Sequence, residues 1–331
     1  MRTIAFFNNK GGVGKTTLVY HLAWMMHLLG KRVLVADLDP QSNVTSMFLT
    51  DDEFDKLSEA GGQSTIFSAL RPFLGGESGL GALEPWYAAE GLGLLLGDLS
   101  LSMAEDQFSE TWPKCLDGDG RAFRVTTALH QLIHQAATTM QADLVLIDVG
   151  PNLGSLNRTA LIAAQEVVVP LAPDLYSLQG LANLGPRLFV WREAWRKRLD
   201  SAPEDLNLSL PRGEMQPIGY VVLQHAMRAD RPVQAYQRWL ERIPTTFATK
   251  VLQQPESFPS PPVQDDPHCL AMLKNYRSLM PLAQDARKPM FLLKPADGAL
   301  GSHTYAVEQC RKDFQALAEA ILDRAARTLP L

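Results

Sequence analysis

Short runs of apolar residues alternate along this chain with segments in which apolar residues recur at helical spacing. The runs predict buried strands over residues 3–7, 32–36, 92–96, 143–147, 167–171, 218–223 and 290–293. Their nearly continuous apolar character is typical of a sheet that helices cover on both faces. Helical spacing follows the first run over 18–29, where Gly30 would end the helix, and fills 304–327 near the end of the chain. This pattern predicts an α/β fold with a doubly wound, mostly parallel sheet.

The rhythm of strands and helices continues through the 331 residues, so we expect one domain over 1–331 with surface elaborations. Two loops interrupt it, a Gly-rich one at 74–91 and a Pro-rich one at about 254–268. Hydrophobic residues make up 46% of the chain and charged residues 20%, which excludes disordered, collagen-like and coiled-coil proteins. Three widely separated cysteines argue against a disulfide framework or a zinc site and indicate a reducing cytoplasm. No apolar stretch is long enough to span a membrane.

The formal net charge of −5 is unevenly distributed. Residues 51–120 hold 14 acidic and three basic side chains, so this acidic elaboration carries −11 and the rest of the chain +6. A polyanion would therefore have to meet the remaining surface. The acidic elaboration could present a surface to a protein partner, although a solvated acidic face explains it as well.

The clearest chemical signal is the Gly-rich sequence Lys10–Thr17, which lies between the first strand and the first helix. Glycines let the backbone curl around a phosphate group, and the following helix adds the positive end of its dipole. Lys15 would reach the β- and γ-phosphates, and the Thr16 hydroxyl would hold Mg²⁺. Asn9 stands where the strict motif has its first glycine. The predicted nucleotide-binding residues of this loop are Gly11, Gly12, Val13, Gly14, Lys15, Thr16 and Thr17.

Carboxylates end two of the predicted strands. Asp37-Leu38-Asp39-Pro40-Gln41 follows the second strand, and Leu144–Ile147 runs directly into Asp148. The carboxyl ends of parallel strands are where an α/β sheet places its ligand groups. A carboxylate there can support a magnesium ion or position an attacking water, and Asp148 reads as the acidic residue of a Walker B strand.

The sequence KGGVGKTT resembles the deviant Walker A motif of the ParA/MinD family of P-loop ATPases, which are SIMIBI-type P-loop NTPases. The segment from Asp37 to Gln41 resembles the DxDPQ switch of that family. The resemblance spans nearly the whole chain and is closest to the ParA-like partition ATPases. It departs at Gly150, where the family usually has Pro, and at Gln224, which stands where an Asn often contacts adenine.

The resemblance implies an ATP hydrolase that uses ATP and Mg²⁺. It gives Lys10 the task of reaching across an ATP-bound homodimer to the nucleotide of the partner copy. Asp39 would be needed for hydrolysis, and would join Thr16 and Asp148 around the metal. Lys10, Lys15 and Asp39 are thus the catalytic candidates, and Gln224 is a candidate for base binding.

The resemblance also implies partners: nonspecific DNA, and a ParB-like or other protein that stimulates hydrolysis. The task would be DNA partition or cargo positioning by a cytoplasmic, nucleoid-associated protein. Because the loop begins at Lys10, we expect no preceding DNA-reading domain. Three alternatives stay open: a MinD-like membrane-cycling ATPase, a regulatory ATPase that recruits a protein without DNA, and a metabolic ATP-dependent ligase.

Weaker patterns have competing explanations. The basic segment 187–198 could neutralise DNA phosphates or be a solvated helix face, and its two tryptophans are expected in the core. His130 and His134 share a helix face, but Gln131 replaces the glutamate that a zincin motif needs. The mixed charges of the last helix favour core packing over membrane attachment. Arginines that could join the basic segment are Arg228, Arg231, Arg238 and Arg242.

Overall fold

An eight-stranded sheet runs through the protein in the order β10-β7-β6-β1-β5-β2-β4-β3. Its strands are β1 (Arg2–Phe6), β2 (Val33–Leu38), β3 (Trp86–Ala89), β4 (Leu92–Leu95), β5 (Leu144–Val149), β6 (Glu166–Leu171), β7 (Gln216–His225) and β10 (Cys269–Lys274). All neighbouring pairs are parallel except β3 and β4. The predicted doubly wound, mostly parallel sheet is therefore confirmed, and β1 lies at its centre, where the strand order changes direction.

The computed structural model describes residues 1–331 except 60–63, 78, 226, 229–230, 233, 256–259, 277 and 328–331. Its helices are α1 (Lys15–Leu28), α2 (Asn43–Phe48), α3 (Asp51–Glu59), α4 (Ile66–Leu74), α5 (Glu105–Lys114), α6 (Gly120–Thr126), α7 (Ala128–Thr139), α8 (Ser155–Ile162), α9 (Leu175–Leu199), α10 (Gln234–Leu240), α11 (Ile243–Thr246), α12 (Met280–Ala286) and α13 (Ser302–Arg327). A short hairpin, β8 (Met227–Arg228) with β9 (Arg231–Pro232), precedes α10.

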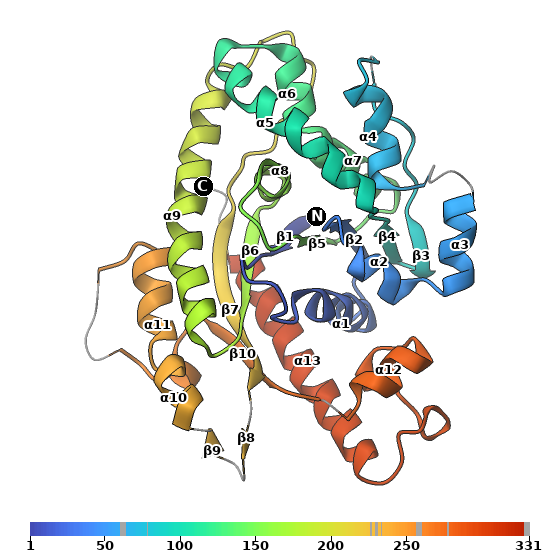
Figure 1. The fold of residues 1–331 in the computed structure, drawn as a ribbon, viewed down its shortest axis with the longest axis vertical. Helices are drawn as coiled ribbons and strands as arrows, with labels where there is room; N and C mark the ends of the chain where they lie inside the picture. The colour runs from blue at the N-terminus through green and yellow to red at the C-terminus, as the bar shows by residue number, and fades with distance from the viewer. Residues whose placement is uncertain are drawn as a thin grey trace.

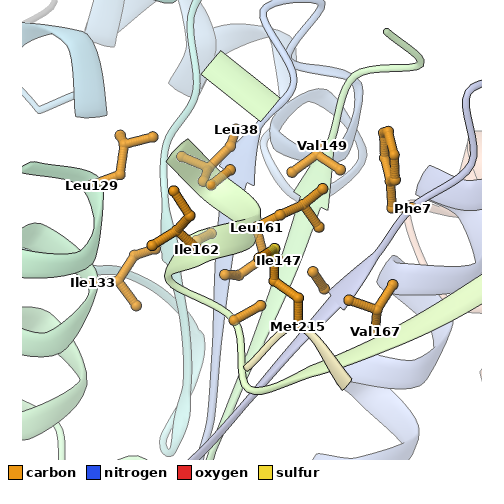
Figure 2. Packing of buried hydrophobic residues seen from close by; sticks show 14 of the residues in the cluster. Phe7, Leu38, Leu129, Ile133, Ile147, Val149, Leu161, Ile162, Val167 and Met215 are labelled. Atoms are coloured by element: carbon orange, nitrogen blue, oxygen red, sulfur yellow. The ribbon is translucent and has the colours of Figure 1, made fainter. Parts of the chain in front are cut away.

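Helices cover both faces of the sheet, and a separate apolar cluster fills each side. On one face, side chains from α4 to α9 pack against alternate residues of the strands, including Phe7, Ile147 and Val167 (Figure 2). On the other face, α1, α2 and α13 pack against Ile4 and Phe6. Figure 1 shows α9 running along the β6–β7 side of the molecule, while α13 crosses behind α1. The two-sided burial explains why apolar residues run nearly continuously along the strands rather than at every second position.

The strand predictions are correct for the six runs up to β7, with shifts of one or two residues at the ends. The prediction at 290–293 is wrong, because Met290–Leu292 forms a 3₁₀ turn, η5. The Met290 N–H does not join a sheet but donates to Nε2 of His21, 3.1 Å away. An apolar run of four residues cannot by its periodicity distinguish a strand from a buried turn.

Two edge strands lie where the apolar pattern gave no strand. Trp86–Ala89, inside the predicted Gly-rich loop, forms β3 and pairs antiparallel with β4. Cys269–Lys274 forms β10, which is only half buried along most of its length. The Pro-rich loop at 254–268 is described in part and holds a 3₁₀ turn, η4, at Val263–Asp265.

The last helix packs in the core, as its mixed charges suggested. Cys310, Phe314, Leu317 and Ile321 on α13 are buried, and α13 lies against α1 and η5. Within the described ranges, the chain contains no helix that is both long enough and apolar enough to cross a bilayer.

Candidate nucleotide-binding site

The loop between β1 and α1 has the backbone that a phosphate cradle needs. Gly12 and Gly14 have positive φ angles of 73° and 89°, a conformation that residues with side chains rarely adopt. Gly14 stands at the N-cap position of α1, so the unpaired N–H groups of the first helical turn follow it directly. Val13 is buried and ties the loop to the core. The structure thus places residues 11–17 as a turn and a helix start, the arrangement expected from the sequence.

Lys15 and Thr16 both contact Asp148 at the end of β5. The Lys15 ammonium pairs with Oδ1 of Asp148, and the Thr16 hydroxyl donates to Oδ2 at 2.9 Å. Burial of Asp148 raises its pKa, while the positive charge of Lys15 opposes that shift. The structure therefore brings together three side chains that the sequence assigned to phosphate and metal.

Asp37 lies beside Asp148 in the register of β2 and β5. Its Oδ2 accepts hydrogen bonds from the backbone N–H of Thr45 at 2.9 Å and from the Thr45 hydroxyl at 2.6 Å. Its Oδ1 is buried and has no hydrogen-bond partner among the described residues. Burial, and then the negative charge of Asp148, raise the pKa of Asp37 to about 7. An orphaned carboxylate oxygen next to Asp148 and Thr16 fits a site that a hydrated cation would complete.

Asp39 lies two residues further along, close to the loop that follows β5. Its carboxylate accepts the N–H of Gln41 at 3.0 Å, and a Cβ built on Gly150 would stand 3.4 Å from its Oδ1. The negative charge of Asp39 contributes to raising the pKa values of both Asp37 and Asp148. Asp39 therefore belongs to the same cluster, at its outer side.

Buried hydrogen bonds hold the loop after Asp148, although Gly150 replaces a proline of the family pattern. Asn157 of α8 is buried and donates to the carbonyl oxygens of Gly150 at 2.7 Å and Asn152 at 2.8 Å. Glu105 of α5 accepts the N–H groups of Ser155 at 2.6 Å and Leu156 at 2.9 Å. Neither of these two side chains was predicted from the sequence, and their hydrogen bonds hold the loop and the start of α8.

Lys10 has a different partner from Lys15. Its ammonium pairs with Asp174, which precedes α9, and its backbone N–H donates to Oδ1 of Asn8 at 3.0 Å. Asp174 also caps α9 by accepting the N–H of Ser177 at 2.8 Å. The two lysines of the loop thus lie in different surroundings.

A pocket of about 140 Å³ opens beside the loop. Val13, Gly14 and Thr17 line one side of it, and Lys274 and Asn275 stand at the end of β10 on the other. Largely apolar walls with a few polar groups suit a nucleotide base. Gln224 lies on β7 directly after Leu223, which lines this pocket, but its side chain falls outside the described part of the structure. Lys274 and Asn275 escaped the sequence analysis because β10 itself was not predicted.

A larger cavity, of about 260 Å³, lies between α1, α2 and α12. Tyr20, His21, Met47 and Arg287 are among its lining residues, and none of the predicted loop residues is. This cavity is therefore separate from the nucleotide-binding loop.

The basic segment of α9 divides into structural and exposed residues. Arg192 donates to the carbonyl oxygens of Glu214 and Met215, and the buried Arg198 donates to that of Trp112. Both tryptophans of the segment are buried, as expected for core residues. Exposed bases in this region are Arg187, Arg196 and Lys197, with Arg238, Arg242 and Lys250 on the neighbouring elements. The side chains of Arg228 and Arg231 lie outside the described part.

Arg238 and Arg242 flank Trp239. The guanidinium carbons stand 4.5 Å and 5.5 Å from the centre of its ring.

His130 and His134 lie side by side on α7, with ring centres 5.8 Å apart. Burial, and then the charge of His134, lower the pKa of His130 to about 4. Among the residues that the structure describes, no three His, Cys, Asp or Glu side chains are grouped closely enough to ligate a metal ion on their own.

Comparison with known proteins shows the family to which this chain belongs. Residues 1–200 match a family model described as "AAA domain". The chain is 35% identical over 199 residues to the chromosome-partitioning ATPase Soj of Thermus thermophilus, covering 60% of this chain and 66% of that protein. It is 32% identical over 187 residues to the chromosome partitioning protein ParA of Myxococcus xanthus, covering 55% and 56%. The matched part is thus less than two thirds of either relative.

Among solved structures, protein DIP2308 from Corynebacterium diphtheriae superposes with a TM-score of 0.72 at 26% identity, over 98% of each chain. The family match covers the loop, both acidic strand ends and the start of α9. The chain belongs to the ParA family of P-loop ATPases.

Proposed function

We propose that this protein is an ATP-hydrolysing switch that pairs with a second copy of itself while ATP is bound. The observation that carries the proposal is the convergence of Lys15, Thr16 and Asp148 at the end of the Gly-rich loop. On nucleotide binding, the Lys15 ammonium would exchange the Asp148 carboxylate for phosphate oxygens. The Thr16 hydroxyl and Asp148 would then hold magnesium between them.

The donor set fits magnesium, which prefers oxygen ligands and retains several of its waters. Thr16 and Asp148 offer oxygens on one side, and the buried, unpartnered Oδ1 of Asp37 could accept from a metal-bound water on another. The ion, when bound, would neutralise charge on the transferring phosphoryl group.

Asp39 is the residue that we assign to the attacking water. It lies at the outer side of the acidic cluster, and the Gln41 N–H fixes one of its oxygens. Its other oxygen could therefore orient a water toward the γ-phosphate. Loss of this carboxylate should slow hydrolysis and leave nucleotide binding intact.

Pairing would occur over the edge of the sheet that carries the loop. Next to Asp174 and Lys10, the first turn of α9 exposes Leu175 and Tyr176, the latter with 69% of its side chain open to solvent. Large exposed apolar side chains beside a functional loop are typical of surfaces that another protein covers. In the pair, Lys10 would reach the nucleotide of the partner and stabilise the charge that develops during transfer.

Nonspecific DNA is the polyanion that we propose for the basic side. Arg238 and Arg242 are exposed and are held against Trp239, so they are partly ordered before any ligand arrives. Arg187 and Lys250 lie on elements that pack together, since Gly185 of α9 meets the backbone of Lys250. A second protein would stimulate hydrolysis, and the outcome would be partition of DNA or positioning of another cargo.

The test is retention of the protein on nonspecific duplex DNA with ATP, with ADP and without nucleotide, at low and moderate salt. We expect binding only with ATP, lost in Lys10→Ala and kept in Asp39→Ala. Phosphate release, measured in parallel, should fall at least tenfold in Asp39→Ala. ATP-dependent pairing without DNA binding would instead direct attention to a protein partner.

The dependence of DNA affinity on salt concentration tests which arginines contact the DNA. If Arg238 and Arg242 each neutralise one phosphate, replacing both with glutamine reduces the slope of log affinity against log salt by about 1.8. The matched control is Arg196→Gln, because Arg196 is an exposed arginine on α9 that already pairs with Glu193. A slope that is equal in wild type and the double variant would remove α10 from the DNA surface.

A further inference from the structure

The loop lysine that should act in the partner copy is held by its own chain. The Lys10 ammonium pairs with Asp174, a residue 164 positions away that also caps α9. We propose that Asp174 restrains Lys10 in the unpaired protein, and that ATP-driven pairing has to break this contact in both copies. The inference rests on the proposed function, because it concerns the residue that is expected to cross the dimer interface.

Asp174 cannot follow Lys10 toward a partner, because its surroundings are fixed. Its second oxygen accepts the Ser177 N–H, and the Ser177 hydroxyl accepts the N–H of Ala172 at 3.2 Å. Asn8, at the start of the loop, donates to the carbonyl oxygen of Pro170 at 2.6 Å. The end of β6 is therefore attached to the loop, and the turn after it is attached to the helix, which leaves the Lys10 side chain as the part that would swing away.

The contact is weak enough to be broken. The Lys10 and Asp174 side chains are 28% and 30% exposed, whereas those of Lys15 and Asp148 are 7% and 0% exposed. Partial burial disfavours the charged form of Asp174, but hydrogen bonds from Lys10 and Ser177 outweigh it, so its pKa lies below the ordinary value. The Asp174 carboxylate is thus charged at neutral pH, in a pair that water and salt can reach.

A restraint of this kind makes pairing depend on the nucleotide. Without ATP, a lysine that leaves Asp174 gains no anion in exchange, so the pair of chains loses two ionic contacts. With ATP, the triphosphate on each copy supplies a stronger anion for the arriving lysine. A ligand shifts an equilibrium only by its preference for one state over the other: the triphosphate supplies that preference, and Asp174, by stabilising the unpaired state, keeps pairing low until ATP is bound.

The test measures ATP-dependent pairing by sedimentation in the Asp39→Ala variant. In this variant slow hydrolysis should leave the ATP-bound dimer intact during the measurement. Asp174→Asn removes the charge and keeps an oxygen for the Ser177 N–H. If each exposed contact changes the equilibrium about two- to fivefold, releasing both should lower the dimer dissociation constant about 4- to 25-fold. The shift should shrink as salt is raised from about 0.1 M to about 1 M, since salt screens exposed charges.

Asp174→Glu keeps the charge and should pair like the parent protein. In the nucleotide-free chain, Asp174→Asn should increase acylation of the Lys10 amine but not of the Lys15 amine. Unchanged or weaker pairing of Asp174→Asn overturns the restraint, as does an effect that salt does not alter. A parent protein that stays monomeric with ATP would remove the proposed switch itself, a result distinct from failure of the restraint alone.

Discussion

Lys10 and Lys15 belong to one loop, and each pairs with an aspartate, yet the two ion pairs differ in how deeply they are buried. Lys15 and Asp148 are buried at the centre of the sheet, where each compensates the charge of the other. Lys10 and Asp174 lie at the surface beside the first turn of α9. Removing one partner of a buried ion pair is costly, whereas exposed pairs contribute little to folding. We infer that the first pair is part of the core and that the second is free to change partners.

The largest effect should come from breaking the buried pair. Lys15→Met leaves the carboxylate of Asp148 buried without its cation, and we expect a loss of about 3 kcal/mol in the free energy of unfolding, measured by urea titration without nucleotide. A carboxylate whose folded pKa is raised destabilises the fold above that pKa, so the deficit should shrink as the pH is lowered.

Lys15→Met/Asp148→Asn is the matched control, because it removes both charges. It should recover part of the stability that the single variant loses. A double variant no more stable than Lys15→Met would mean that Asp148 is not an uncompensated charge in the single variant.

The stability of the segment after Asp148, at the start of α8, should also depend on Glu105. Its carboxylate accepts two N–H groups at the start of α8, and Glu105→Gln should cost about 1–2 kcal/mol at pH 7. Burial works against ionisation of Glu105, but its hydrogen bonds prevail and its pKa is lowered. Its stabilisation is therefore present above the unfolded pKa of about 4.3 and disappears as the pH falls through the lower folded value.

Unfolding of Glu105→Gln and wild type should consequently converge in acid. Glu110→Gln changes an exposed acid on the same helix and should leave the unfolding curve unaltered at both pH values. A constant difference between Glu105→Gln and wild type over the whole pH range would show that the charge of Glu105 is not what stabilises α8.

Local patterns predicted the elements of the proposed nucleotide site, because phosphate binding dictates local sequence. A phosphate loop needs glycines at fixed positions between a strand and a helix, and a carboxylate at a strand end follows its apolar run directly. The strand at 143–147 and the helix after Gly14 could therefore be predicted from the local sequence without any tertiary information. So could most of the sheet, since its buried parallel strands are apolar along nearly their whole length.

Tertiary partners could not be predicted, since nothing local encodes them. Glu105 lies 50 residues before the helix that it caps, and Asp174 lies 164 residues after Lys10. The edge strand β10 was missed because it is half buried and lacks a continuous apolar run. Of the five bases in 187–198, only the fold could reveal that Arg192 and Arg198 hydrogen-bond backbone carbonyls.

Gly180 offers a way to disturb the Lys10 end through packing rather than charge. A Cβ there would lie 2.4 Å from Oδ1 of Asn9, at the start of the loop. Helix propensity alone favours alanine over glycine by about 1 kcal/mol. We nevertheless expect Gly180→Ala to lose about 1 kcal/mol in urea unfolding and to weaken ATP binding, because α9 or the loop has to move. Gly79→Ala, with open space around its Cβ, is the control, and a stabilised Gly180→Ala would show that the loop yields without cost.

The smallest effect on folding should come from Lys10→Met. The pair with Asp174 is partly exposed, so the free energy of unfolding should change by no more than about 0.5 kcal/mol. Asp174 keeps its bond to the Ser177 N–H, so the start of α9 should be preserved. Urea unfolding of Lys10→Met and Lys15→Met under one set of conditions measures the contrast directly. If both variants lost the same stability, Lys10 would be a structural residue, and a side chain that the fold requires in place is not one that can leave for a partner.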